Sequence, residues 1–259
     1  MGGNVRRLEG QVALVTGASM GMGKAIARAL AAEGASVAIT ARGEDLLRQA
    51  ADEIRSAGVD VLDCPADVSD PASVETMVGT VLEHFGRIDL LVNNAGVNLP
   101  HRSLSDITVE GWQTTVGINL SGPFLCTRAV LPAMRAQGRG TIVNVSSFSG
   151  KRPSVHAGVA YSASKAALNS FTESINLEER RNGIRACLVV PGEVNTPHVE
   201  KRLHPPSPEA RAAMLQPEDV AAAVVFVATM PERATVEELI IRPTVLRNRD
   251  DDARAVAST

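Results

Sequence analysis

Short apolar segments alternate with helical segments along almost the whole chain, and this alternation constrains the fold more than any other feature. Most of these segments are apolar on both faces, which is typical of strands buried on both sides of a parallel sheet. Helices between such strands must cover both faces of the sheet. The sequence therefore predicts an α/β fold with a doubly wound parallel sheet of about seven strands. The predicted strands span residues 12–16, 36–40, 59–64, 88–92, 141–145, 185–190 and 238–241.

Helical segments fill the intervals between these strands, and no linker divides the chain. The hydrophobic fraction of 44% supplies a core large enough for one domain. Asn119 lies inside the longest predicted helix, which Pro123 and Pro132 should bend or break. We predict one domain over residues 1–246 and a charged, mobile tail over residues 247–259. The predicted helices span residues 24–33, 44–56, 71–85, 109–136 and 217–230, and a further helix contains Tyr161.

The composition argues against several classes of function. A net charge of −3 gives no electrostatic basis for binding nucleic acid or an anionic membrane. No apolar run approaches the roughly 20 residues of a membrane helix, and the N-terminus lacks the apolar core of a signal peptide. Cys64, Cys126 and Cys187 lie in apolar segments without metal-ligand spacing. Reduced core thiols of this kind are typical of a cytoplasmic protein, so we expect a cytoplasmic location and no metal site.

A glycine-rich loop connects the first predicted strand to the first predicted helix. Its spacing is Gly17-x3-Gly21-x-Gly23. Glycine permits a tight turn and close approach of the backbone to a phosphate, and the helix N-terminus offers free N–H donors. A glycine turn without a ligand is the alternative, but the strand–turn–helix context favours dinucleotide binding.

The end of the second predicted strand selects between the two dinucleotides. An acidic residue there would bind the ribose 2′-hydroxyl and mark NAD. Ala41 occupies that position, and Arg42, which follows it, suits a 2′-phosphate through charge-assisted hydrogen bonds. Arg42 could instead be a solvated surface charge. The missing carboxylate carries more weight, so the predicted cofactor is NADP, with NAD as the alternative.

Tyr161 and Lys165 form a candidate acid–base pair. Tyr161 is the only tyrosine in the chain, and Lys165 follows four residues later in a helical segment. Residues at this spacing lie on one face of a helix, so both side chains should point into the same cleft. A nearby cation favours the phenolate and lowers the pKa of a phenol. Taken alone, such a pair is more often a packed ring and a solvated charge.

Seven short motifs follow one another from the glycine loop to the segment after the sixth predicted strand. They are Thr16-Gly17-Ala18-Ser19-x-Gly21-x-Gly23, Asp67-Val68, Asn93-Asn94-Ala95-Gly96, Asn119, Ser146-Ser147, Tyr161-x3-Lys165 and Pro191-Gly192-x-Val194-x-Thr196. In their order they resemble the short-chain dehydrogenase/reductase family of the NADP-preferring type. The resemblance implies a Rossmann-type fold, hydride transfer between NADP(H) and a small carbonyl or alcohol, and a homotetramer or homodimer.

The resemblance implies catalytic roles for four residues. Tyr161 would be the acid–base, and Lys165 would lower its pKa and hold the nicotinamide ribose. Ser147 would hydrogen-bond the substrate oxygen as charge develops on it. Asn119 would keep a water on the proton path to Lys165. From the residues alone, Ser147 could be a strand-end cap and Asn119 a polar group inside a helix.

The same resemblance implies the cofactor contacts. Asp67 and Val68 would flank the adenine, although Asp67 could also be a helix N-cap. Thr196 would hold the carboxamide and so fix which face of the ring delivers hydride. The other implied contacts are Gly17, Ser19, Met20, Gly21, Met22, Gly23, Arg42, Asn94, Ala95, Gly96, Tyr161, Lys165, Pro191, Gly192 and Val194.

The chain departs from the family pattern in three places. The interval from Ser147 to Tyr161 is one residue longer than the commonest spacing, so the loop should bulge, and Ser149 becomes a rival for Ser147. Met20 stands where many NADP-type members have a basic residue. The ending Glu237-Glu238-Leu239-Ile240-Ile241-Arg242-Pro243-Thr244 replaces a glycine-rich strand. This ending looks like that of the NADP-dependent 3-hydroxy-acid and sulfoacetaldehyde reductases.

Two other functions remain open on the same fold. A non-catalytic dinucleotide-binding regulatory protein would have no need of Ser147, Tyr161 and Lys165. Relatives that carry out epimerisation or dehydration usually differ at the tyrosine helix or have a longer substrate domain. The sequence therefore favours an oxidoreductase.

Basic residues in three loops suggest a variant of this function, a reductase specific for an anionic aldehyde or 3-oxo acid. A cleft of one charge concentrates ions of the other, and arginine binds carboxylates and sulfonates through two hydrogen bonds. Only Glu193 and Glu200 oppose these residues nearby, but exposed basic residues are usually solvated, and an uncharged carbonyl compound remains the main prediction. The loop residues are Asn98, His101, Arg102, Lys151, Arg152, His156 and His198.

Overall fold

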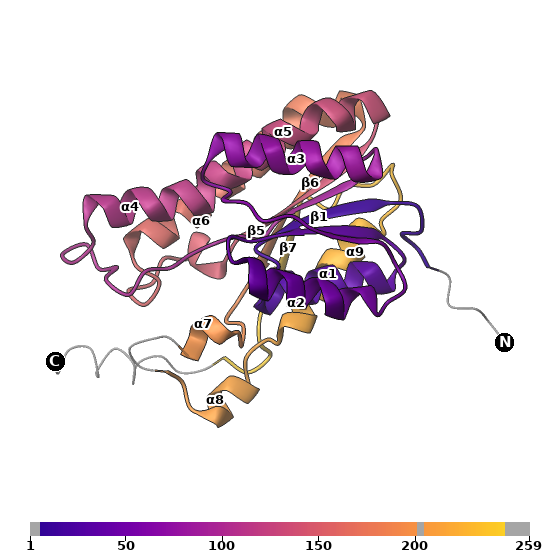
Figure 1. The fold of residues 1–259 in the computed structure, drawn as a ribbon. Coiled ribbons are helices and arrows are strands. Elements are labelled where there is room, and N and C mark those ends of the chain that lie inside the picture. The colour runs from indigo at the N-terminus through magenta and orange to yellow at the C-terminus, as the bar shows by residue number, and fades with distance from the viewer. Residues whose placement is uncertain (1–5, 201–204, 247–259) are drawn as a thin grey trace.

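The computed structural model describes residues 6–200 and 205–246, which form one parallel sheet of seven strands (Figure 1). The strand order β3-β2-β1-β4-β5-β6-β7 places β1 beside β4. The chain builds outward from β1 to β3, then returns past β1 and builds in the other direction, which is the predicted doubly wound fold. The strands are β1 (Val12–Thr16), β2 (Ser36–Thr40), β3 (Val61–Asp63), β4 (Leu90–Asn93), β5 (Gly140–Val145), β6 (Ile184–Pro191) and β7 (Glu238–Ile241).

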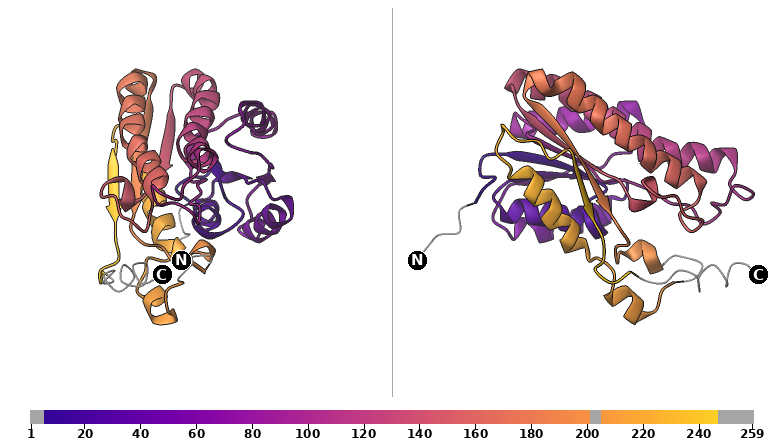
Figure 2. Two further views of the ribbon diagram at one scale, coloured as in Figure 1. Left: turned by 90° about the vertical axis from the view of Figure 1, so that its left-hand side faces the viewer. Right: turned by 180° about the vertical axis from the view of Figure 1, so that it is seen from behind.

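The central strands are buried on both faces, as their composition predicts. Every residue of β1, β4 and β5 is buried. β7 differs, because its residues alternate between exposed and half-buried positions at the edge of the sheet (Figure 2). The predicted strands are confirmed, with their ends displaced: β3 begins at Val61 rather than residue 59, and β4 begins at Leu90 rather than residue 88.

Helices cover both faces of the sheet (Figure 1). Three of them pack on one face and three on the other, and each group encloses its own apolar core. The first group contains α1 (Gly21–Ala32), α2 (Glu44–Arg55) and α9 (Pro217–Ala228). The second contains α3 (Pro71–Phe85), α5 (Gly122–Gln137) and α6 (Val159–Glu179).

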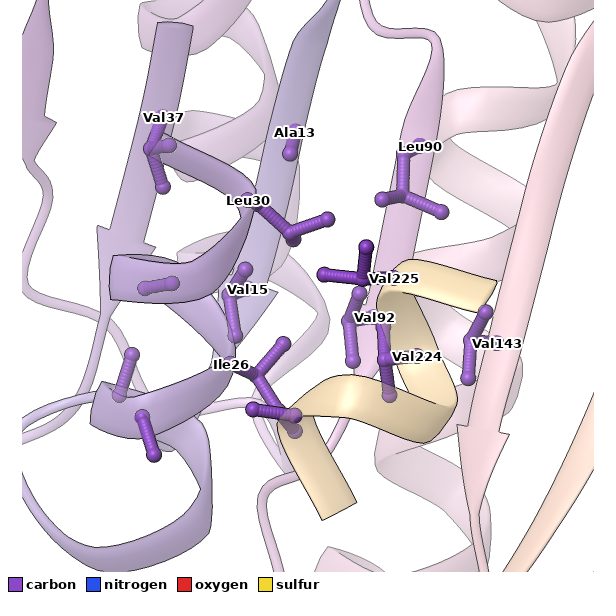
Figure 3. Packing of buried hydrophobic residues seen from close by; sticks show 14 of the residues in the cluster. Ala13, Val15, Ile26, Leu30, Val37, Leu90, Val92, Val143, Val224 and Val225 are labelled. Carbon is purple, nitrogen blue, oxygen red and sulfur yellow. The ribbon is translucent and has the colours of Figure 1, made fainter. Parts of the chain in front are cut away.

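The core under α1 and α9 joins the first and last parts of the described chain. Ile26 and Leu30 of α1 and Val224 of α9 lie side by side against the strands, and all three are fully buried (Figure 3). Burial of a large aliphatic side chain contributes about 1.5–3 kcal/mol. The C-terminal helix therefore holds the helix that follows the glycine loop against the sheet.

The helix predicted over residues 109–136 is divided into three pieces. α4 (Val109–Val116) passes into a π turn (Gly117–Ser121), and α5 follows directly. The Gly122 N–H donates to the Gly117 carbonyl, five residues back. Pro123 has no N–H to continue an α-helical ladder across this turn, whereas Pro132 lies inside α5 without ending it. Asn119 thus lies in the π turn, a feature often found at functional sites.

A buried carboxylate ties the amino ends of several strands together. Asp89, just before β4, accepts a hydrogen bond from the Val12 N–H of β1 at 2.9 Å. It also pairs with Arg87 at 2.6 Å and with Arg139, just before β5, at 3.5 Å. These contacts lie at the end of the sheet opposite the glycine loop.

Two short helices that the sequence analysis did not predict lie after β6, α7 (Pro197–Glu200) and α8 (Pro208–Ala212). The predicted tail over residues 247–259 lies outside the described residues, and the domain division stays a prediction. In residues 6–200 and 205–246, no helix combines the length and apolarity needed to cross a membrane.

Candidate active site

The predicted site residues gather at the carboxyl ends of the central strands. β1 and β4 lie side by side, so the glycine loop after β1 meets the segment after β4. β5 and β6 continue the same edge with Ser147 and Gly192. In a doubly wound sheet this edge, where the strand order reverses, is the position of the ligand crevice.

The glycine loop leaves no room for side chains where the backbone turns. A Cβ on Gly17 would lie 2.8 Å from the Ala95 Cα, and one on Gly23 would lie 2.2 Å from the Gly17 carbonyl oxygen. Gly17 and Gly21 also have positive φ angles of 64° and 57°. No side chain caps the N-terminus of α1, and no acidic residue lies in its first turn. This loop fits a bound diphosphate, because N–H donors and the positive helix end remain available.

Asn94 and Thr16 fix the loop against the segment after β4. The Asn94 amide nitrogen donates to the carbonyl oxygens of Thr16 and Gly17 at 2.9 and 3.1 Å. The Thr16 hydroxyl in turn accepts the N–H groups of Asn94 and Ala95, both at 3.0 Å. The side chains of Asn94 and Thr16 therefore shape the crevice from behind. Thr16 stands just before Gly17 in the sequence, but that position alone predicts no role for its hydroxyl.

The segment after β2 leaves Arg42 exposed beside an acidic turn. The Asp67 carboxylate accepts hydrogen bonds from the hydroxyl and N–H of Ser69 at 2.6 and 2.9 Å. These bonds, with the charge of Arg42, lower the pKa of Asp67. Val68 is buried, and a Cβ on Gly122 would approach its side chain to 2.9 Å. Asp67 is therefore held as a carboxylate near Arg42, while Val68 packs onto the start of α5.

Lys165 is a buried cation beside Tyr161. The side chain is only 4% exposed, and its Nζ donates to the Val145 carbonyl at 2.8 Å. The Nζ lies 6.0 Å from the centre of the half-buried Tyr161 ring. Burial lowers the pKa of Lys165 to about 8, so most of the ammonium stays charged at neutral pH. A Cβ on Gly96 would lie 3.5 Å from this Nζ, so the glycine keeps the space beside the ammonium open.

Asn119 connects the loop after β4 to the helix of Tyr161. Its Oδ1 accepts the Val97 N–H at 2.8 Å, and its Nδ2 donates to the Val97 carbonyl at 2.9 Å. The same Nδ2 lies 3.3 Å from the Ser164 hydroxyl, which donates to the Tyr161 carbonyl. The side-chain amide of Asn119 is thus engaged in holding two parts of the site together.

Ser147 caps a 3-10 turn (Phe148–Gly150) that follows β5. Its Oγ accepts the Ser149 N–H at 3.2 Å, so the hydroxyl hydrogen remains available as a donor. Ser149, the predicted rival, lies inside the turn and orients Ser147 through its backbone. The longer interval before Tyr161 contains this turn and the residues up to Val159, where α6 begins.

The segment after β6 reaches back to the glycine loop. The Gly192 N–H donates to the Ile241 carbonyl at 2.7 Å, and Val194 pairs with Leu215. Thr196 is buried, and a Cβ on Gly21 would lie 3.6 Å from its side chain. Pro191 ends β6 next to these residues. The segment after β6, which contains Gly192, Val194 and Thr196, therefore lies beside the glycine loop, as predicted for two parts of one cofactor crevice.

The residues predicted to line a basic substrate pocket differ in their exposure and in their contacts. Lys151 forms an ion pair with Glu238 at 2.5 Å, and Glu200 pairs with Arg211 at 2.7 Å. Asn98, His101 and Arg152 are exposed, whereas Arg102 and His156 are half-buried. Glu193 accepts the Leu215 N–H through its backbone. The side chain of His198 lies outside the described residues.

Arg242 is a neighbour of the site that the sequence analysis did not identify. Its guanidinium carbon lies 4.0 Å from the centre of the Phe148 ring, next to Ser147 in the chain. Arg242 and Phe148 are almost one hundred residues apart, so no local pattern could have revealed this contact.

A doubly wound sheet with a glycine cradle and a Tyr–Lys pair at its carboxyl edge defines a dinucleotide-dependent oxidoreductase. A family model described as short chain dehydrogenase matches residues 11–206. An uncharacterized oxidoreductase of Staphylococcus epidermidis is 35% identical over 237 residues, which are 92% of this chain and 99% of the relative. The chain therefore belongs to the short-chain dehydrogenase/reductase family and is an NAD(P)-dependent enzyme of that family.

Solved structures agree with this assignment. A metagenomic short-chain oxidoreductase in complex with NADP has a TM-score of 0.80 and is 38% identical in sequence. The match covers 93% of this chain and 100% of that one. An alcohol dehydrogenase from the archaeon Thermococcus sibiricus, complexed with 5-hydroxy-NADP, has a TM-score of 0.83 and 32% identity, over 92% of this chain and 98% of that one.

Proposed function

We propose that this enzyme transfers hydride between NADP(H) and a small carbonyl or alcohol, with Tyr161 as the acid–base. The observation that carries the proposal is the buried Lys165 ammonium 6.0 Å from the only tyrosine ring, at the edge where the cofactor loop lies. A buried cation beside a phenol is an arrangement that favours the phenolate and so activates tyrosine for proton transfer.

The chain's own residues would divide the work of carbonyl reduction. When bound, NADPH supplies the hydride. Tyr161 gives a proton to the carbonyl oxygen, and Ser147 donates its free hydroxyl hydrogen to the same oxygen as negative charge develops. Lys165 stabilises the tyrosinate that remains. Asn119 keeps α6 and the loop after β4 in register, and we retain the prediction that it supports a water on the path to Lys165.

We further propose NADP as the preferred cofactor. Ala41 stands where an acidic residue would bind the ribose 2′-hydroxyl of NAD. Arg42, the next residue, is exposed and can form charge-assisted hydrogen bonds with the 2′-phosphate of NADP. The two solved relatives were crystallised with NADP or a derivative of it. Gly17, Gly21 and Gly23 would hold the diphosphate, and Thr196 the carboxamide. Asp67 would flank the adenine.

An activity screen tests this proposal directly. Purified enzyme is incubated with NADPH or NADH and a panel of small aldehydes and ketones, and cofactor oxidation is followed. We expect turnover of several neutral carbonyl compounds with NADPH and less with NADH. A protein that binds NADPH but consumes none of the panel would support the regulatory alternative, and an altered substrate without net cofactor oxidation would support epimerisation or dehydration.

We propose that an anionic group on the substrate is not required. Glu238 neutralises Lys151, one of the cations that supported the anionic variant. The panel therefore includes matched pairs of an anionic and a neutral aldehyde of similar size. A kcat/KM at least tenfold higher for the anionic member, lost in Arg152→Ala, would reinstate the anionic-substrate reductase.

We also propose that the enzyme assembles as a homotetramer or a homodimer. Large apolar side chains remain exposed on the outer surfaces of α4, α5 and α6, where Trp112, Phe124 and Leu177 are 40%, 47% and 71% exposed. Exposed apolar groups on adjacent helices are typical of protein interfaces. Light scattering after size exclusion would show a mass of about four or two chains for the wild type, and a smaller mass for Phe124→Asp.

We propose a cytoplasmic location as well. Cys64, Cys126 and Cys187 are buried as free thiols just after β3, in α5 and in β6, as in proteins of reducing compartments. Cell fractionation would test this.

A further inference from the structure

The 3-10 turn after Ser147 is held between two elements that lie far apart in the sequence. On one side it meets α6: a Cβ on Gly150 would lie 2.6 Å from the Lys165 backbone carbon, so the two backbones are in contact. On the other side, side-chain contacts of Phe148 and Lys151 connect it to Arg242 and Glu238, at the two ends of the edge strand β7. Alternate residues of a strand share one face, so Glu238 and Arg242 can both reach this turn.

The first contact with β7 is an ion pair. Lys151, the residue after the turn, places its Nζ 2.5 Å from the Glu238 Oε1. The two side chains are 29% and 37% exposed, so the pair is partly shielded from solvent. It fixes the far end of the turn to the start of β7.

The second contact is a cation over an aromatic ring. The Arg242 guanidinium carbon lies 4.0 Å from the centre of the Phe148 ring, a favourable cation–π distance. Phe148 also packs against the buried cluster formed by Leu168 of α6 with Leu188 and Val190 of β6. This contact fixes the near end of the turn, one residue from Ser147.

The turn in turn orients the Ser147 hydroxyl. Its Oγ accepts the N–H of Ser149, which lies inside the turn, between the two contacts with β7. A displacement of the turn would therefore move the donor that Ser147 presents to a substrate oxygen. Small displacements of such groups are costly for catalysis, because the hydrogen bond must match the position of the developing charge.

We propose that Glu238 and Arg242 are positioning residues for Ser147, acting through the turn that they clamp. We call these two contacts the β7 clamp. The proposal rests on the proposed function only in giving Ser147 a catalytic role. Neither side chain is assigned a contact with substrate or cofactor.

The test begins with Glu238→Gln, which removes the charge and keeps the shape. A partly exposed ion pair contributes modestly, so we expect kcat to fall about three- to fivefold. NADPH affinity and the unfolding midpoint should stay near wild type. The charge exchange Lys151→Glu with Glu238→Lys should recover most of the loss. Glu232→Gln, which breaks the ion pair with Arg139 at 3.1 Å near the opposite end of the sheet, is the matched control.

Two substitutions of Arg242 test whether its positive charge over the Phe148 ring matters. Arg242→Lys keeps a cation over the ring and should retain most activity, whereas Arg242→Gln should lose about as much as Glu238→Gln. Equal loss in both Arg242 variants would mean that the cation over Phe148 is not what matters.

The decisive measurement repeats Glu238→Gln in a Ser147→Ala background. If the β7 clamp acts through Ser147, the second substitution should lower kcat no further. A full additional three- to fivefold loss, or an unchanged kcat in Glu238→Gln alone, would overturn the proposal.

Hydrogen exchange gives a readout that does not depend on activity. Amides of residues 147–152 should exchange about three- to fivefold faster in Glu238→Gln, while those of β1 stay unchanged. Unchanged exchange in the turn would also overturn the proposal. Absence of any NADPH-dependent turnover in the wild type would instead overturn the proposed function and leave this structural result in place.

Discussion

At the scale of single residues, the Tyr161 hydroxyl carries the proposed chemistry. We predict that Tyr161→Phe lowers kcat by a factor of at least about 100, the usual contribution of general acid–base catalysis. The ring and its packing are retained, so NADPH affinity should change little. Steady-state kinetics with a carbonyl substrate and a fluorescence titration of NADPH measure both quantities. Turnover near the wild-type value would rule out this mechanism.

Lys165 should leave a signature in the pH dependence of stability. Burial lowers its pKa from 10.5 to about 8 in the folded state. Below pH 8 both states hold the proton, and the cost of burying the charge is fully present. Between pH 8 and 10.5 the unfolded state binds more protons than the folded state, so stability rises with pH.

We predict that the wild type gains up to about 3 kcal/mol of unfolding free energy relative to Lys165→Met across this window. Denaturant titrations of both proteins at several pH values measure the difference, and subtraction removes the titrating groups that do not interact with Lys165. A difference that does not change with pH would show that the folded-state pKa of Lys165 is close to that of a free lysine.

Cofactor choice should depend on Arg42. Arg42→Ala removes a charge-assisted contact to the 2′-phosphate, so we predict NADPH binding about tenfold weaker and NADH binding unchanged. Ala41→Asp should repel the phosphate and favour NADH. Titration of both cofactors against both variants measures the ratio. An unchanged ratio would mean that the phosphate contacts lie elsewhere.

At the scale of elements, the π turn places Asn119 where it holds two segments together. Asn119→Leu would leave the Val97 N–H and carbonyl without their partners, which lie at 2.8 and 2.9 Å. We predict a loss of about 2–4 kcal/mol in unfolding free energy, since both groups are partly buried and each one left unpaired costs about 1–3 kcal/mol. Asn98→Leu, the same change at an exposed neighbour, is the control. Equal, small effects in both variants would contradict this role.

The π turn also shows what sequence patterns could and could not reveal about elements. The long helical stretch and the disruptive effect of Pro123 were visible, but a π turn and a kink have the same local pattern. The turn depends on contacts with Val97 and α6, which are distant in the sequence. The short helices α7 and α8 were missed for a similar reason, because each has too few residues to show periodicity.

At the scale of the whole molecule, Asp89 connects β1, β4 and β5, which are far apart in the sequence. Asp89→Ala would remove an acceptor for Val12 and the partner of Arg87 and Arg139. We predict a loss of about 2–3 kcal/mol in unfolding free energy, with kcat retained, because the site lies at the other end of the sheet. Asp60→Ala, which breaks an exposed pair with His84, should cost much less. Similar losses in both variants would refute the role of Asp89.

The sequence predicted the sheet and the position of the glycine loop well because local signals specify them. Apolar runs identified all seven strands, and the glycine spacing located the loop before Gly23. The contacts of Lys151 with Glu238 and of Arg242 with Phe148 were not predictable, because each joins the segment after β5 to β7 or the residue after it, far along the chain. Exposed basic residues look alike in sequence whether they face a substrate, solvent or a carboxylate.

The Tyr–Lys pair has one practical consequence, since the chain contains a single tyrosine. Near-ultraviolet absorbance changes when a phenol ionises, and no second phenol in this protein contributes to the signal. A spectroscopic titration of the intact enzyme therefore reads the protonation of Tyr161 alone, without isotope labels or mutagenesis of competing groups. The same titration of Lys165→Met would show how much the neighbouring ammonium alters the acidity of the proposed proton donor.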